Sequence, residues 1–157
     1  MDPVVVASLI KPTADQLIEV ADLFDHYRRH YGEPAVPGQT LEWLQEQTDH
    51  GRLTVFTAHI GKDLIGLATA AALPASLRLS CYWQLRDLYV APGARRRGAG
   101  RALLDAVHQA ATAAGAVRLS VQTEPGNAAA LELYRTSGFV PVEDLRVLTL
   151  SIHNGDT

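Results

Sequence analysis

The chain has 157 residues, the usual size of one compact domain and too few for two ordinary ones. Its content of 47% hydrophobic and 20% charged residues excludes a chain that is disordered throughout. The formal net charge of −3 excludes a general attraction to nucleic acid, and the single cysteine, Cys81, excludes an internal disulfide.

A run rich in β-branched residues, Val4 to Ile10, predicts the first strand. Lys11 and Pro12 end this run, which is therefore too short for the core of a signal peptide or for a membrane span. We expect a cytoplasmic protein that does not enter the membrane.

Two helices are predicted next. Thr13 and Gln16 have the spacing of a capping box, and apolar residues continue at helical spacing to about His30. A shorter helix begins near Thr40 and is stopped by Gly51.

The middle of the chain predicts a meander of three strands. Leu53–Ile60 and Leu64–Leu73 flank a short connection that contains glycine, which is typical of an antiparallel hairpin. A turn at Pro74 then leads into a longer strand, Leu79–Val90.

Helices and strands alternate in the last third of the chain. In chain order we expect a helix from about Gly100 to Ala114, a strand over Val117–Gln122, a helix over Asn127–Ser137, and two short strands over Phe139–Val142 and Leu145–Ile152. The whole order predicts an α/β (α+β) fold with one mixed, mainly antiparallel sheet of about seven strands flanked by about four helices. We expect residues 1–157 to form one domain, with 154–157 as a frayed tail.

A basic loop that contains glycine lies between the meander and the helix that follows it. Its residues are Arg95, Arg96, Arg97, Gly98, Ala99, Gly100 and Arg101. Unpaired backbone N–H groups and the helix dipole favour an anion at a helix N-terminus, and glycine lets a phosphate come close to the backbone. The loop therefore predicts a phosphate site.

The order of residues in this loop differs from that of two nucleotide-binding motifs. A P-loop is excluded, because Gly100 is not followed by Lys and then Ser or Thr. A dinucleotide site is the closer rival, since Gly98 and Gly100 precede a helix and Glu124 lies near the end of the next strand. Leu103 in place of the third glycine argues against it.

Two segments resemble the signatures of the GNAT superfamily of acyl-CoA N-acyltransferases. Arg95–Gly100 is similar to Q/R-x-x-G-x-G/A, and Asn127–Phe139 is similar to N-x-x-A-x-x-L-Y-x-x-x-G-F. The resemblance implies an acetyl-CoA-dependent N-acetyltransferase that acts on a primary amine of a small molecule or peptide, by direct attack in a ternary complex. A non-catalytic acyl-CoA binding or sensing domain is the alternative, and a homodimer is left open.

The resemblance also implies which residues hold coenzyme A. The loop from Arg95 to Arg101 would bind the pyrophosphate, and Asn127 and Tyr134 would also contact the cofactor. The backbone of Leu88, Tyr89 and Val90 would pair with the pantetheine amides like an added strand. In the family this strand bulges and diverges from its neighbour, which opens a slot for the cofactor.

Two residues are candidates for the chemistry. Tyr134 matches the family tyrosine that donates to the coenzyme A sulfur, although a tyrosine at this helical position also suits the core. The position that aligns with the family's glutamate base is Gln84, which cannot take up a proton usefully. Asp87, the only carboxylate between Gln84 and Val90, is the candidate base, directly or through water, or else a structural residue.

The end of the first predicted helix is expected to line the acceptor pocket. Tyr27, Arg28 and Tyr31 are its candidate contacts, with Arg28 placed to bind an acceptor carboxylate, although Tyr27 and Tyr31 also have the spacing of a packed pair. His26 and His30 have the spacing of metal ligands but no carboxylate signature beside them, so we expect no metal.

Overall fold

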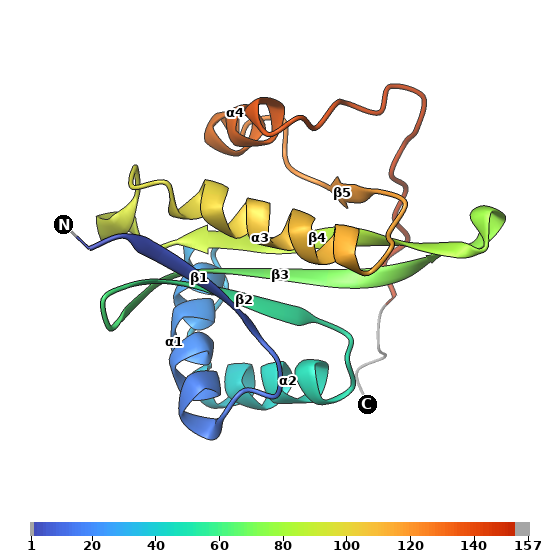
Figure 1. Ribbon diagram of the computed structural model, residues 1–157. Coiled ribbons are helices and arrows are strands. Elements are labelled where there is room, and N and C mark those ends of the chain that lie inside the picture. The colour runs from blue at the N-terminus through green and yellow to red at the C-terminus, as the bar shows by residue number, and fades with distance from the viewer. Residues whose placement is uncertain (1, 153–157) are drawn as a thin grey trace.

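The computed structural model describes residues 2–152, which form one central sheet with helices on both faces (Figure 1). In chain order the elements are β1 (Val4–Leu9), α1 (Ala14–His30), α2 (Pro37–Asp49), β2 (Thr54–Ile60), β3 (Asp63–Ala75), β4 (Ser80–Val90), α3 (Ala99–Ala113), β5 (Leu119–Val121) and α4 (Ala128–Thr136). The mixed α/β fold and the four helices agree with the prediction.

The sheet has the order β1-β2-β3-β4-β5. The first three pairings are antiparallel and that of β4 with β5 is parallel, so the predicted hairpins and the crossover through α3 are both present.

The strand count is the part of the fold prediction that was wrong. The structure has five strands within residues 2–152, because the predicted strands over Phe139–Val142 and Leu145–Ile152 have no regular structure. Phe139 packs on the core, but the larger apolar residues from Val140 to Ile152 are exposed, with Leu148 at 89%. Alternating apolar residues do not hold a strand without a neighbour to pair with, and β5 offers an edge of only three residues. The predicted tail, 154–157, lies outside the described residues.

Two apolar clusters hold the helices on the sheet. One lies under α3 and includes Leu103, Leu104 and Val107 at 0–1% exposure. The other lies under α1 and α2, on the opposite face, and includes Phe24 and Leu44 (Figure 1). The sheet is therefore covered on both faces beside β4, the strand from which the site is built.

Individual residues explain where α1 begins and how β3 packs closely against β4 and α3. The side chain of Thr13 accepts from the Gln16 N–H at 3.2 Å and that of Gln16 from the Thr13 N–H at 2.9 Å, which is the predicted capping box of α1. A Cβ at Gly66 would lie 3.1 Å from the Tyr89 carbonyl oxygen and 3.2 Å from a Leu103 methyl group, so glycine lets β3 fit between β4 and α3. Across residues 2–152, each helix is too short or too polar to cross a bilayer.

Candidate active site

A β-bulge reshapes the end of β4. On β3, Thr69 lies opposite Asp87 while the next residue, Ala70, lies opposite Leu85, so Arg86 has no opposite partner. Side chains two residues apart on a regular strand share a face. Here Leu85 packs in the cluster under α3, whereas Asp87 bonds to Tyr27 of α1 on the other face. The bulge therefore turns Asp87 toward α1.

Beyond this bulge β4 loses its neighbour on one side. The pairing with β5 covers only Trp83 to Leu85, although β4 continues to Val90. The Ala91 N–H donates to the Ile65 carbonyl at 2.8 Å. Along an antiparallel pair, alternate residues bond to the neighbouring strand. The backbone groups of Leu88 and Val90 therefore point away from β3, toward the open side.

Tyr89, which we also expected to offer its backbone there, directs its backbone toward β3 instead. Its side chain packs in the cluster under α1 and α2. The strand thus diverges from its neighbour, as the resemblance implies, and two of the three expected backbone contacts face the gap.

α3 begins at a row of free backbone N–H groups. Arg96 and Gly98 adopt left-handed conformations, with φ of 65° and 81°. The first helical bond runs from the Ala102 N–H to the Gly98 carbonyl at 3.0 Å, and within residues 2–152 the N–H groups of residues 96–101 have no acceptor. Such a row at the positive end of a helix dipole binds phosphate.

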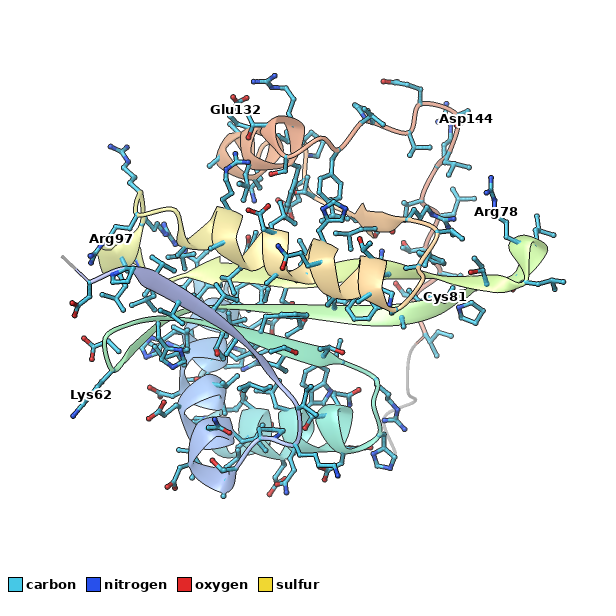
Figure 2. The ribbon with its side chains drawn as sticks, viewed as in Figure 1. Lys62, Arg78, Cys81, Arg97, Glu132 and Asp144 are labelled. Atoms are coloured by element: carbon cyan, nitrogen blue, oxygen red, sulfur yellow. The ribbon has the colours of Figure 1, made fainter. Side chains whose placement is uncertain are left out.

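The four arginines of this loop differ in what they contact. Arg95 donates from Nε to the Val90 carbonyl at 3.1 Å, and Arg101 donates to the hydroxyls of Ser137 and Thr136 at 3.2 and 2.5 Å, which ties α3 to α4. Arg96 and Arg97 are exposed, and Arg97 marks the loop in Figure 2. These two side chains are the ones available to an anion.

Tyr134 combines a packed ring with a free hydroxyl. The residue is 8% exposed, and its ring centroid lies 5.5 Å from that of Phe139. Within residues 2–152 its hydroxyl has no hydrogen-bond partner. Burial, with a smaller contribution from Tyr31, raises the pKa of Tyr134, so the phenol stays protonated at neutral pH.

Asn127, expected near the cofactor, caps the helix that carries Tyr134. Its side-chain oxygen accepts from the Ala130 N–H at 3.3 Å at the start of α4. The side-chain oxygen is therefore committed to the helix, and the amide N–H₂ group is what remains for a ligand.

Asp87 is held by two hydroxyl groups. Its Oδ1 accepts from the Tyr27 hydroxyl at 3.0 Å, and its Oδ2 accepts from the Thr69 hydroxyl on β3. Burial and the charge of Asp87 raise the pKa of Tyr27 well above its ordinary range, so Tyr27 remains a donor at every ordinary pH. A carboxylate has about four lone-pair sites, so Asp87 keeps acceptor capacity for a further group.

A cavity of about 460 Å³ opens beside this carboxylate, between α1 and α2. It is lined by Phe24, Tyr27, Arg28, Tyr31, Glu33, Val36, Gln39, Thr40, Trp43 and Asp87. All three predicted acceptor contacts lie in this lining together with Asp87.

Arg28 has a structural role that the sequence did not reveal. Its Nη1 donates to Asp25 Oδ1 at 3.0 Å and to the Pro34 carbonyl at 2.9 Å, and its Nη2 lies 4.0 Å from Glu33. The guanidinium thus holds the connection between α1 and α2. Both hydrogen bonds use Nη1, and Arg28 also lines the cavity, so its contact with an acceptor stays a prediction.

Asp25 is the centre of this connection and is 4% exposed. It also accepts from the Val36 N–H at 3.2 Å and from the Thr40 hydroxyl at 3.0 Å. Burial by itself would raise the pKa of Asp25, but the hydrogen bonds from Val36, Thr40 and Arg28 stabilise the carboxylate and lower it.

The sequence model of the acetyltransferase (GNAT) family matches residues 19–139 of the chain. The chain belongs to the GNAT acetyltransferase family. It is an acetyl-CoA-dependent N-acetyltransferase, and the cofactor expected for the family is therefore confirmed.

Two relatives share most of this GNAT domain. The uncharacterized N-acetyltransferase YhfO of Bacillus subtilis (strain 168) is 30% identical over 120 residues, which are 76% of this chain and 80% of that protein. The phosphinothricin N-acetyltransferase of Streptomyces coelicolor is 28% identical over 138 residues, which are 83% of this chain and 80% of that protein.

Solved structures agree with the GNAT fold. The crystal structure of a probable acetyltransferase has a TM-score of 0.87 at 27% identity and covers 96% of this chain and 99% of its own. An aminoglycoside N-acetyltransferase in complex with CoA has a TM-score of 0.79 at 22% identity, with 97% and 96% covered. The latter similarity supports the fold alone.

Three residues of the GNAT site were missed by the sequence analysis. Thr69, which donates to Asp87, is fully buried in β3, and the one signal in the sequence was a threonine among the apolar residues of that strand. Asp25 and Gln39 have no distinctive spacing.

Proposed function

We propose that this GNAT protein transfers the acetyl group to the primary amine of a small molecule, by direct attack of the amine in a ternary complex. The observation that carries the proposal is that Asp87 of β4 borders a cavity, while the open edge of β4 and the free N–H groups before α3 lie at the end of the same strand. A cavity of about 460 Å³ is the size that small ligands occupy. Phosphinothricin and aminoglycosides, named for two similar proteins, are the first acceptors to assay.

The cofactor would lie along the open edge of β4. The free N–H groups of residues 96–101, with Arg96 and Arg97, suit the pyrophosphate. The Leu88 backbone and the Val90 N–H suit the pantetheine amides, because unpaired strand groups accept an added strand, whereas the Val90 carbonyl already accepts from Arg95. The Leu88 N–H is a donor for negative charge that develops on the reacting carbonyl oxygen.

The two candidate chemical groups have complementary roles. Bound acetyl-CoA supplies the thioester carbonyl. Asp87 would accept a proton from the acceptor ammonium, directly or through water, so that the amine nitrogen can form the new C–N bond. As the C–S bond breaks, Tyr134, which burial keeps protonated by raising its pKa, would give its proton to the sulfur, and the second proton that leaves the amine nitrogen would restore the phenol.

Thermal unfolding tests the cofactor site. Acetyl-CoA at about 100 times its Kd should stabilise the fold by about 2.7 kcal/mol, which raises Tm by about 5–10 °C, whereas NAD should have no effect. Gly100→Glu should abolish the shift, because it places a carboxylate among the phosphate donors. Gly100→Ala is the matched control, since a Cβ there makes ordinary contact with Leu133 at 3.5 Å.

The outcomes separate the alternatives. A shift with NAD and none with acetyl-CoA would favour a dinucleotide site. A shift with acetyl-CoA that survives Gly100→Glu would place the anion site elsewhere. An acetyl-CoA shift without thiol release for any amine would favour a binding domain over an enzyme.

A further inference from the structure

We infer that the acceptor is a primary amine with an aromatic body and no acidic group, bound with its ammonium at Asp87 and its ring among the aromatic side chains of α1 and α2. The inference rests on the proposed function and names the substrate class of the same site. Three observations support it: the aromatic rings that line the cavity, the charged residues of the lining, and the two hydrogen bonds that hold the Asp87 carboxylate.

The cavity wall is a continuous series of aromatic rings. The Phe24 centroid lies 6.0 Å from that of Trp43 and 5.4 Å from that of Tyr27, and Tyr27 lies 5.3 Å from Tyr31. These spacings are those of favourable aromatic pairs, so a ligand ring of similar size can extend the series.

Two of these rings, those of Trp43 and Tyr31, are only partly buried. Phe24 is 6% exposed, whereas Trp43 is 45% and Tyr31 is 56% exposed. Both exposed rings line the cavity, one from α2 and one from the end of α1. Covering exposed aromatic surface with an apolar ligand removes it from water, which favours binding of that ligand.

The charges of the lining disfavour an acidic acceptor. Among the described residues of the lining, Arg28 is the only cation and Glu33 and Asp87 are the anions. The guanidinium of Arg28 already contacts Asp25 and the Pro34 carbonyl. A carboxylate or phosphinate on the acceptor would therefore meet two anions and would compete with Asp25 and Glu33 for one guanidinium.

Asp87 gives the acceptor its orientation. The hydroxyls of Tyr27 and Thr69 each occupy one lone pair, one on each carboxylate oxygen, and both come from packed elements. The lone pairs that remain can accept from an ammonium group. An amine bound there has its nitrogen at the β4 end of the cavity, so that its body extends toward Trp43.

A panel of four matched amines tests this assignment by thiol release from acetyl-CoA. Phenethylamine has the ring and the ammonium, L-phenylalaninol adds a neutral arm, L-phenylalanine adds a carboxylate, and propylamine lacks the ring. We expect kcat/KM for phenethylamine and L-phenylalaninol to exceed that for L-phenylalanine and for propylamine by about tenfold or more. L-Phenylalaninol controls for the bulk of the carboxylate.

Variants at Trp43 test whether the aromatic side chains of the cavity cause the preference for aromatic amines. Trp43→Leu should raise KM for phenethylamine by about tenfold while kcat changes little, because the ring contacts the body of the acceptor and not its nitrogen. Trp43→Phe should retain most of the affinity. The acetyl-CoA shift in Tm serves as the folding control for both variants.

Fluorescence gives a readout of acceptor binding that does not need turnover. Phenethylamine added with CoA should change the emission of the wild type and much less that of Trp43→Phe, which keeps only Trp83. Equal or better turnover of L-phenylalanine or phosphinothricin, or a Trp43→Leu variant with unchanged KM, would overturn the inference and leave the acetyltransferase activity standing. Absence of thiol release with every amine, despite an acetyl-CoA shift, would instead overturn the proposed function, and the inference with it.

Discussion

Replacing Tyr134 by phenylalanine removes one hydroxyl and leaves the ring. The ring, 8% exposed, keeps its packing against Phe139 at 5.5 Å between centroids. Since the hydroxyl has no partner within residues 2–152, its loss breaks no hydrogen bond there. We therefore expect the free energy of unfolding to change by less than about 0.5 kcal/mol.

The chemical step should respond far more strongly. General acid catalysis contributes about 10²- to 10⁴-fold. At about 1.36 kcal/mol for each factor of ten, the loss of the proton donor raises the barrier by about 3 to 5 kcal/mol. The assay is a single turnover, in which protein loaded with acetyl-CoA is mixed with excess amine and the released thiol is followed.

Two comparisons make this result decisive. Tyr82→Phe, near the start of β4 where the ring contacts Arg118 at 4.1 Å, is the matched control and should react at the wild-type rate. The acetyl-CoA shift in Tm should be the same for both variants. A single-turnover rate of Tyr134→Phe within about twofold of the wild type would refute the role of this hydroxyl as acid.

Three further changes follow from the same structure. Asp87→Asn should lower kcat/KM near neutral pH and recover as the pH rises, because more amine is then already deprotonated; a loss that is equal at every pH, with lower stability, would mark Asp87 as structural. Leu103→Ala, at a position with 0% exposure under α3, should cost about 2–5 kcal/mol in urea unfolding, and a cost below about 1 kcal/mol would contradict the packing described. The pKa of Asp25 lies below its ordinary value of 3.8, so its stabilisation is complete above that pH and is lost as the pH falls through the folded-state value. Asp25→Asn should therefore make the unfolding free energy fall less steeply below about pH 4, and an unchanged slope would assign the acid sensitivity to other groups.

The sequence was sufficient where a feature depends on neighbouring residues. The capping box at Thr13 and the free N–H groups of the loop before α3 are both local, since a helix start leaves its own N–H groups unpaired whatever packs around it. The end of β4 at Val90 was predicted correctly for the same reason, because Pro92 and Gly93 interrupt the strand. The residues expected to hold the pyrophosphate remain a prediction, but their backbone geometry followed from the chain.

The features that only the tertiary structure decided join residues that are distant in the chain. Asp87 faces Tyr27 because of the bulge at Arg86, and it meets Thr69 because of the register of β3 against β4. Nothing in the local pattern encodes a one-residue shift of register, although that shift reverses which face a side chain occupies.

The contacts of Arg28 and the conformation of residues 139–152 were also decided by the tertiary structure. The charge of Arg28 suggested a ligand contact, but the fold places the Asp25 carboxylate and the Pro34 carbonyl within hydrogen-bond distance of it. Residues 139–152 have strand-like alternation, yet a strand exists only where another backbone pairs with it. Motif resemblance thus indicated the family and local sequence the loop before α3, whereas packing and strand register decided what surrounds Asp87 and the cavity.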